Sequence, residues 1–160
     1  YTYTNLGYNL KMSDMQAAVG LAQIKKAKEF HEKRIFNFNL LYKRLKKYNK
    51  IFILPKVAKN AQPSWFGFPL TIKKSVKFNR EEITKYLNDN SIGTRLLFAG
   101  NLVRQPYMKN YNYKIKNDLK SSNIIMERTF WIGLYPGLET KNIIYTVNKI
   151  EKFLSSKGIL

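Results

Sequence analysis

The stretch from Ser91 to Tyr107, SIGTRLLFAGNLVRQPY, concentrates side chains that could bind an anionic or sugar ligand. Its candidate binding residues are Arg95, Phe98, Asn101, Arg104 and Gln105. Arg presents a planar fork of donors that fits phosphate or carboxylate oxygens, and an amide can both donate to and accept from sugar hydroxyls. Because loops at strand ends often carry binding groups, the pattern predicts a ligand-binding loop. The alternative is a basic surface loop whose Arg side chains are only solvated.

The elements around this stretch alternate between helical and strand-like patterns. Ser13 with Gln16 fits a capping box at the start of a long helix, which a kink could interrupt before about Lys50. Asn79 with Glu82 fits a second capping box, and Thr140 is the expected N-cap of the last helix, which Gly158 follows as C′ residue. A short helix is expected at 123–127, strands at 51–54, 65–72, 92–98 and 128–134, and irregular structure at 107–120. This order predicts an α/β fold, an α+β sandwich in which helices cover one face of a small sheet.

Composition limits the classes of function. The chain has 160 residues, of which 44% are hydrophobic, enough for one domain with a core. The net charge of +19 would attract nucleic acid, an anionic membrane or a phosphorylated ligand. The excess is mostly Lys scattered among Asn, Ile and Tyr, a mixture that an A- and T-rich genome also produces. A basic nucleic-acid-binding module therefore stays as the alternative from another class.

Residue types needed for catalysis or metal binding are scarce. The chain has no Cys and one His, so it lacks a disulfide framework and a His-rich metal site, and His31 is expected on a helix surface. No paired carboxylates or glycine-rich phosphate loop are evident. No apolar run approaches the ~18 residues of a membrane span and the start lacks a signal-peptide pattern, so a cytoplasmic protein is expected. The chain begins at Tyr1 without Met, which we interpret as part of a longer protein, inactive on its own.

Three long motifs resemble a known family. The segment GYNLKMSDMQAAVGLAQ (7–23) is similar to the signature of the DegT/DnrJ/EryC1/StrS sugar aminotransferase family. The stretches IGTRLLFAGNLVRQPY (92–107) and RTFWIGLYPGL (128–138) resemble its CDP-4-keto-6-deoxyglucose 3-dehydratase branch. That branch removes the C3 hydroxyl of the sugar during synthesis of 3,6-dideoxyhexoses for lipopolysaccharide. The resemblance extends in order over nearly the whole chain.

The resemblance implies an architecture and a chemistry. The chain would be the C-terminal small domain of a fold-type I pyridoxal-phosphate-dependent protein, with 1–24 as a dimer-interface and active-site segment and 25–160 as the small domain. The catalytic residue would lie upstream: a His in the dehydratases, which use pyridoxamine phosphate, or a Lys in sibling aminotransferases, the nearer alternative. The implied partners are a second copy in a homodimer, a nucleotide sugar and a reductase, with neither nucleic acid nor a membrane. Some members also hold a 2Fe-2S cluster on upstream cysteines.

The resemblance also implies roles for individual residues. Asn9 matches the family Asn that reaches the cofactor phosphate of the partner subunit, Lys11 stands where many relatives carry Arg, and Tyr8 lies beside both. The implied substrate-binding residues are Phe66, Phe68, Arg95, Phe98, Asn101, Arg104, Gln105 and Arg128. For Phe66 and Phe68 the alternative is a place in the core of the sheet, and for Arg128 it is a structural ion pair.

Overall fold

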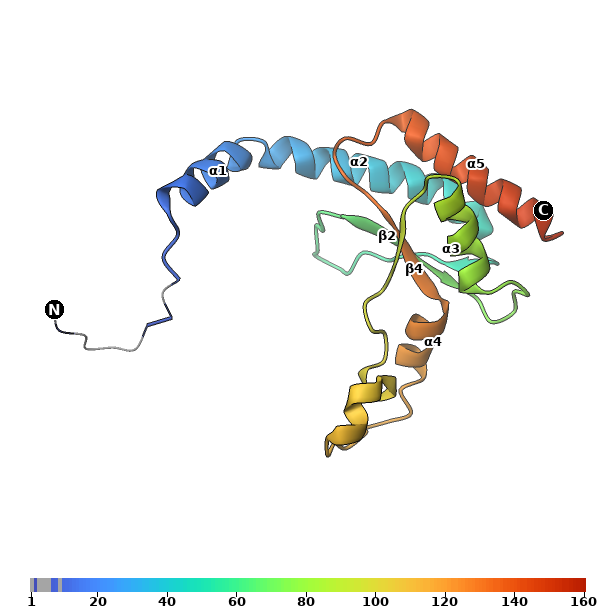
Figure 1. Cartoon of the computed structure of the whole chain (residues 1–160). Helices are drawn as coiled ribbons and strands as arrows, with labels where there is room; N and C mark the ends of the chain where they lie inside the picture. Colours follow the sequence, from blue (N-terminus) through green and yellow to red (C-terminus); the bar gives the residue numbers. More distant parts are fainter. Residues whose placement is uncertain (1, 3–6, 9) are drawn as a thin grey trace.

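A computed structural model describes residues 2, 7–8 and 10–160 (Figure 1). The helices are α1 (Asp14–Ile24), α2 (Ala27–Leu45), α3 (Arg80–Asp89), α4 (Lys120–Arg128) and α5 (Thr140–Ser156), with short 3₁₀ turns η1 (Lys46–Tyr48), η2 (Leu102–Arg104) and η3 (Pro106–Asn110). The strands are β1 (Phe52–Ile53), β2 (Gly67–Ile72), β3 (Thr94–Leu96) and β4 (Thr129–Gly133). The predicted α/β class is confirmed.

The four strands form one antiparallel sheet in the order β1-β2-β4-β3. Burial alternates along β2, where Phe68 and Leu70 are buried, and along β4 from Phe130, where Phe130 and Ile132 are buried. These side chains form the core with apolar residues of α2, α3 and α5, which lie on the same side of the sheet (Figure 1). The intervening Trp131 points to the opposite face, because successive strand residues alternate between faces.

The ends of the helices test the predicted caps. The capping boxes of Ser13 with Gln16 and of Asn79 with Glu82 are both present. The prediction for α5 was wrong by one residue: Glu139 is the N-cap and Thr140 begins the helix. Glu139 accepts from the backbone of Asn142, whose own side chain accepts from the Glu139 N–H, so the same reciprocal bonding is made by an acidic and an amide side chain. Gly158 follows the C-cap with φ +66°, as predicted for a C′ glycine.

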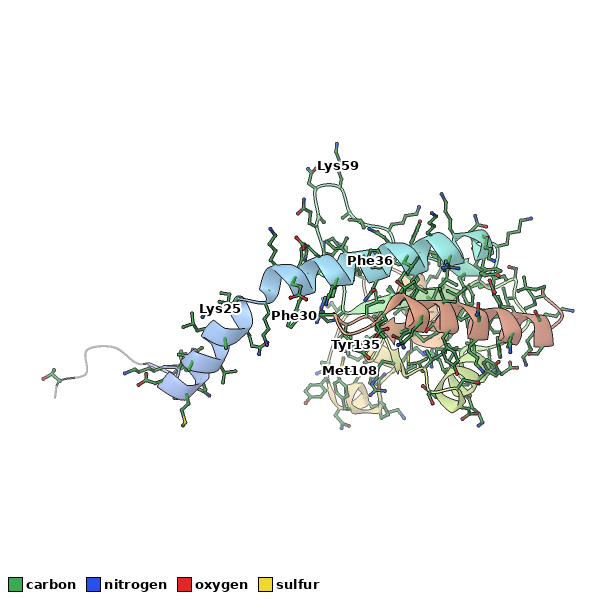
Figure 2. The ribbon with its side chains drawn as sticks, turned by 90° about the horizontal axis from the view of Figure 1, so that it is seen from above. Lys25, Phe30, Phe36, Lys59, Met108 and Tyr135 are labelled. Atoms are coloured by element: carbon green, nitrogen blue, oxygen red, sulfur yellow. The ribbon has the colours of Figure 1, made fainter. Side chains whose placement is uncertain are left out.

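The long N-terminal helix is interrupted, and the interruption separates a packed helix from an unpacked one. The break falls at Lys25 and Lys26, between α1 and α2. Helix α2 buries Phe38, Leu41 and Leu45 in the core, whereas no residue of α1 is buried. On the N-terminal side of Lys25, α1 extends away from the rest of the molecule (Figure 2). The amphipathic pattern therefore predicted the helix, but only the second half finds a packing partner within the described chain.

No described helix is both long enough and apolar enough to cross a membrane.

Candidate functional site

An apolar hollow lies on the face of the sheet opposite the core, and two of the predicted site residues, Phe66 and Phe98, line it. It has a volume of about 270 Å³. The residues that line it are Pro63, Ser64, Trp65, Phe66, Gly67, Pro69, Leu97, Phe98 and Trp131. They come from the segment before β2, from β2 itself, from the middle of β4 and from the loop after β3, so the hollow combines segments far apart in the sequence.

The aromatic cluster WFGF (65–68), which leads into β2, is divided between the two faces of the sheet. The ring of Trp65 stacks on Phe38 of α2, with ring centroids 4.2 Å apart and planes 6° apart. Phe68 is fully buried in the core, the alternative that the sequence left open for it. Phe66 is 58% exposed, and its ring meets the indole of Trp131 edge to face at 5.2 Å and 77°. Of the two candidate Phe residues, Phe66 is therefore the one available to a ligand.

The loop after β3 supplies the opposite wall. Phe98 is 84% exposed and has a left-handed backbone with φ +50°, an uncommon conformation for a bulky residue. Arg95 is exposed and lies opposite Trp131 in the register of β3 and β4. Its Nη1 donates to the carbonyl of Thr94 at 3.1 Å, which fixes one end of the guanidinium. The structure thus brings Phe66, Phe98 and Arg95 to one face of the sheet, two of them directly lining the hollow.

The polar residues of the same loop bind α4. The buried Asn101, 4% exposed, donates from Nδ2 to Oδ1 of Asn123 at 2.9 Å and caps η2 by accepting from the Val103 N–H at 3.2 Å. Arg104 donates to the same Asn123 oxygen at 3.2 Å and pairs with Glu127. These bonds hold the loop against α4 and engage two groups that the sequence assigned to substrate binding.

Close packing reinforces the attachment of the loop. Gly100 has φ +70°, and a Cβ atom there would lie 2.5 Å from the Cα and Cβ of Met126 on α4. Glycine is therefore needed both for the conformation and for the close approach. Gln105 donates from Nε2 to the carbonyl of Ala99 at 3.1 Å, closing the loop on itself. The conformation of the loop is thus held from several sides.

The hydrogen bond that Arg104 donates to Glu127 also affects the ionisation of the Glu127 carboxyl. The Arg104 guanidinium, with smaller contributions from the charges of Arg128 and Lys74, lowers the pKa of Glu127 below its usual value. Arg128 itself donates from Nη1 to the carbonyl of Lys73 at 3.2 Å, which links the end of β2 to the start of β4. The Arg128 guanidinium is therefore partly engaged in this backbone contact. Among the described residues, it does not make the structural ion pair that the sequence left open as the alternative to substrate binding.

The N-terminal candidates lie on an exposed segment. Tyr8, 82% exposed, and Lys11 make no hydrogen bond or ion pair to any described residue, and Asn9 lies outside the described residues. His31 is half-buried on α2. Among the residues that the structure describes, no group of His, Asp and Glu could hold a metal ion.

Trp131 is the site residue that the sequence interpretation missed. It was expected only as part of a strand, within the run RTFWIGL. The available signal was the alternation in β4, which places the indole on the face opposite Phe130 and Ile132. What alternation could not give was the identity of the neighbours, Phe66 and Gly67, more than sixty residues earlier in the chain.

The sequence of the chain is similar to a known protein family and to individual members of known function. The model of the DegT/DnrJ/EryC1/StrS aminotransferase family matches residues 1–151. The chain is 50% identical over 153 residues to the lipopolysaccharide biosynthesis protein RfbH of Salmonella typhimurium, covering 96% of this chain and 35% of that protein. It is 39% identical over 158 residues to the dTDP-4-dehydro-2,6-dideoxy-D-glucose 3-dehydratase of Saccharopolyspora spinosa, covering 99% of this chain and 34% of the relative.

A solved structure shares the fold. The E. coli GDP-4-keto-6-deoxy-D-mannose-3-dehydratase with bound hydrated PLP aligns with a TM-score of 0.83 and 23% identity, over 93% of this chain and 38% of that one. The chain thus spans about a third of the length of the curated relatives it matches, at 35% and 34%.

Proposed function

This chain belongs to the DegT/DnrJ/EryC1/StrS aminotransferase family, and we propose that it is the C-terminal part of a sugar-nucleotide 3-dehydratase. The proposed substrate is CDP-4-keto-6-deoxyglucose, and the product serves dideoxysugar synthesis for lipopolysaccharide. The observation that carries the proposal is the aromatic hollow beside Arg95, present in a chain 50% identical to a lipopolysaccharide biosynthesis protein. Residues 1–24 form the segment that reaches a second subunit, and 25–160 form the small domain.

The hollow has the chemistry that a nucleotide sugar requires. Exposed aromatic faces stack on flat rings, and each such contact contributes on the order of 1–3 kcal/mol to binding of a base. Phe66 and Phe98 offer these faces from opposite walls, and Arg95 offers a fixed guanidinium for a phosphate oxygen. In this proposal the side chains of Asn101 and Gln105 maintain the conformation of the loop that carries Phe98. The Arg104 side chain leaves Glu127 and turns toward the substrate.

The N-terminal segment fits a role in binding the cofactor. A phosphate needs N–H donors and positive charge, which the amide of Asn9 and the ammonium of Lys11 provide, with the phenol of Tyr8 as a further donor. Tyr8 and Lys11 are exposed and free of bonds to described residues, so both are available to a group bound outside this domain. We propose that Tyr8, Asn9 and Lys11 contact the cofactor phosphate of the partner subunit in a homodimer. When bound, pyridoxamine phosphate supplies an amine for the 4-keto carbon and a ring that accepts electrons.

The second candidate is an aminotransferase acting on the same kind of keto sugar, which the family description favours. The two differ in the upstream residue next to the cofactor, a His for dehydration and a Lys for transamination. They share the proposed nucleotide-binding hollow and dimer. The distinction therefore depends on the upstream domain, and the binding role proposed for this chain is common to both.

The experiment uses the full-length enzyme with CDP-4-keto-6-deoxyglucose and pyridoxamine phosphate, analysed by mass spectrometry after one turnover. Deoxygenation replaces the C3 hydroxyl with hydrogen, so the released sugar nucleotide is expected to be lighter by one oxygen atom. In this single turnover the two electrons come from the added pyridoxamine phosphate, which is recovered as pyridoxal phosphate and ammonia. Formation of an amino sugar with glutamate as donor would assign the aminotransferase function instead. Sequencing the coding region upstream of Tyr1 provides an independent check, because it identifies the His or Lys and any cysteines for a 2Fe-2S cluster that would pass electrons from a reductase.

A further inference from the structure

We infer that Trp131 is a positioning residue that fixes the spacing between the two walls of the hollow. The inference rests on the proposed function, because it assumes that the hollow binds part of a nucleotide. Trp131 lies in the central strand β4, between β2 on one side and β3 on the other. Its indole contacts both neighbouring segments, each by a different kind of interaction.

Toward β2, the indole packs directly on the backbone. A Cβ atom built at Gly67 would lie 2.4 Å from Cε3 of Trp131, which is far inside van der Waals contact. Only glycine therefore allows the indole to lie over the strand at this point. The adjacent Phe66 ring meets the same indole edge to face at 5.2 Å. Such an aromatic pair contributes more to stability than its buried area alone would give, and it favours one relative orientation of the rings. Trp131 therefore orients the ring of Phe66.

Toward β3, the indole makes a hydrogen bond. Nε1 donates to the carbonyl oxygen of Leu96 at 3.1 Å. Leu96 is the last residue of β3, and the next two residues, Leu97 and Phe98, line the hollow. Phe98 has a left-handed backbone, so the chain turns sharply just beyond this bond. The hydrogen bond to Trp131 therefore fixes the position of Leu96, and with it the start of the turn that carries Phe98.

The two contacts act together because one rigid ring system makes both. An indole has few torsions, so its N–H and its six-membered ring hold Leu96 and Phe66 at a set separation. A flat ring bound between Phe66 and Phe98 would be sensitive to that separation. We therefore expect changes at Trp131 to alter ligand affinity more than global stability, because Trp131 acts through the positions of Phe66 and Leu96.

The test measures nucleoside diphosphate binding to the full-length enzyme by calorimetry, with CDP, GDP and dTDP as probes. Trp131→Phe keeps an aromatic ring but loses both the N–H donor to Leu96 and the fused bicyclic shape of the indole, and in Gly67→Ala the new methyl group displaces the indole. Each variant is expected to weaken the best-bound probe by about tenfold, equivalent to ~1.4 kcal/mol. The control is Phe78→Leu, a core change on the opposite side of the sheet, which is expected to lower the melting temperature without changing affinity.

The outcomes separate the inference from the proposed function. If the wild type binds a probe and both hollow variants bind it equally well, Trp131 is merely structural and the inference is wrong, while the proposed function stands. If the wild type binds none of the three nucleotides, the proposed substrate class itself is wrong. Reduced affinity in both variants, with melting temperatures lowered no more than in Phe78→Leu, supports the positioning role.

Discussion

The two faces of the sheet carry similar aromatic side chains and yet differ in what contacts them. On the inner face Phe68 and Phe130 are completely buried beneath α2, α3 and α5. On the outer face Phe66 and Phe98 remain exposed around a hollow. The difference teaches that side-chain type alone does not separate a structural aromatic residue from a binding one. The separation depends on whether a helix packs against that face.

The largest expected effect is on stability, at the inner face. Phe68→Ala should reduce the free energy of unfolding by about 3–5 kcal/mol, because it leaves a cavity in the core. Chemical denaturation of the wild type and the variant measures the change. Phe66→Ala is the matched control, the same substitution two residues away at an exposed ring, and should cost far less. Equal losses in both variants would contradict the contrast between the two faces.

The next effect concerns the loop beside the hollow. Arg104→Ala in the full-length enzyme should raise KM for the sugar nucleotide by an amount equivalent to about 1.5–3 kcal/mol, the contribution of a hydrogen bond to a charged group. Glu127→Gln is the control, because it removes the partner of Arg104 but leaves the guanidinium free. A rise in KM for both variants would mean that the pair only holds the loop.

A smaller effect is expected for the exposed ring itself. Phe66→Ala should raise the dissociation constant for the bound nucleotide by about tenfold, since one stacking contact contributes roughly 1–3 kcal/mol. Calorimetric titration measures it, and the melting temperature should change little because the ring is 58% exposed. Phe66→Tyr retains the aromatic face and should bind as the wild type does. Loss of affinity in Phe66→Tyr as well would argue against stacking.

The smallest effect is a pH dependence among the helices that cover the inner face. The Lys47 ammonium and then the Tyr48 hydroxyl, which donates to Glu151 at 2.6 Å, lower the pKa of Glu151 below 4.5. A lowered carboxyl pKa stabilises the fold fully above pH 4.5, and the contribution is lost as pH falls through the lowered value. Glu151→Gln should therefore cost about 1 kcal/mol near pH 7 and progressively less in acid.

Thermal unfolding of Glu151→Gln and the wild type, followed from pH 7 to pH 3, measures this trend. Tyr48→Phe provides the comparison, because it keeps the Lys47 pair and removes only the hydroxyl donor. A stability difference that is independent of pH would show that the ionised carboxylate is not responsible.

The sequence determined the local elements and the family. Ser13 with Gln16 and Asn79 with Glu82 form the capping boxes that their spacing predicts, because the interacting atoms are only three residues apart. The position of Gly158 was predictable for the same reason. The one misplaced cap, Thr140, arose because Glu139 with Asn142 makes the same reciprocal bonds with less usual residue types.

The tertiary structure decided which side chains meet. Alternation alone would put Phe66 and Phe68 on the same face, but the ladder begins at Gly67, so the rule does not constrain Phe66. Asn101 and Arg104 converge on Asn123, about twenty residues later, and Trp131 reaches Phe66 and Leu96 across two strand pairs. Local patterns fix contacts within a few residues, whereas these contacts arise only when distant segments pack together.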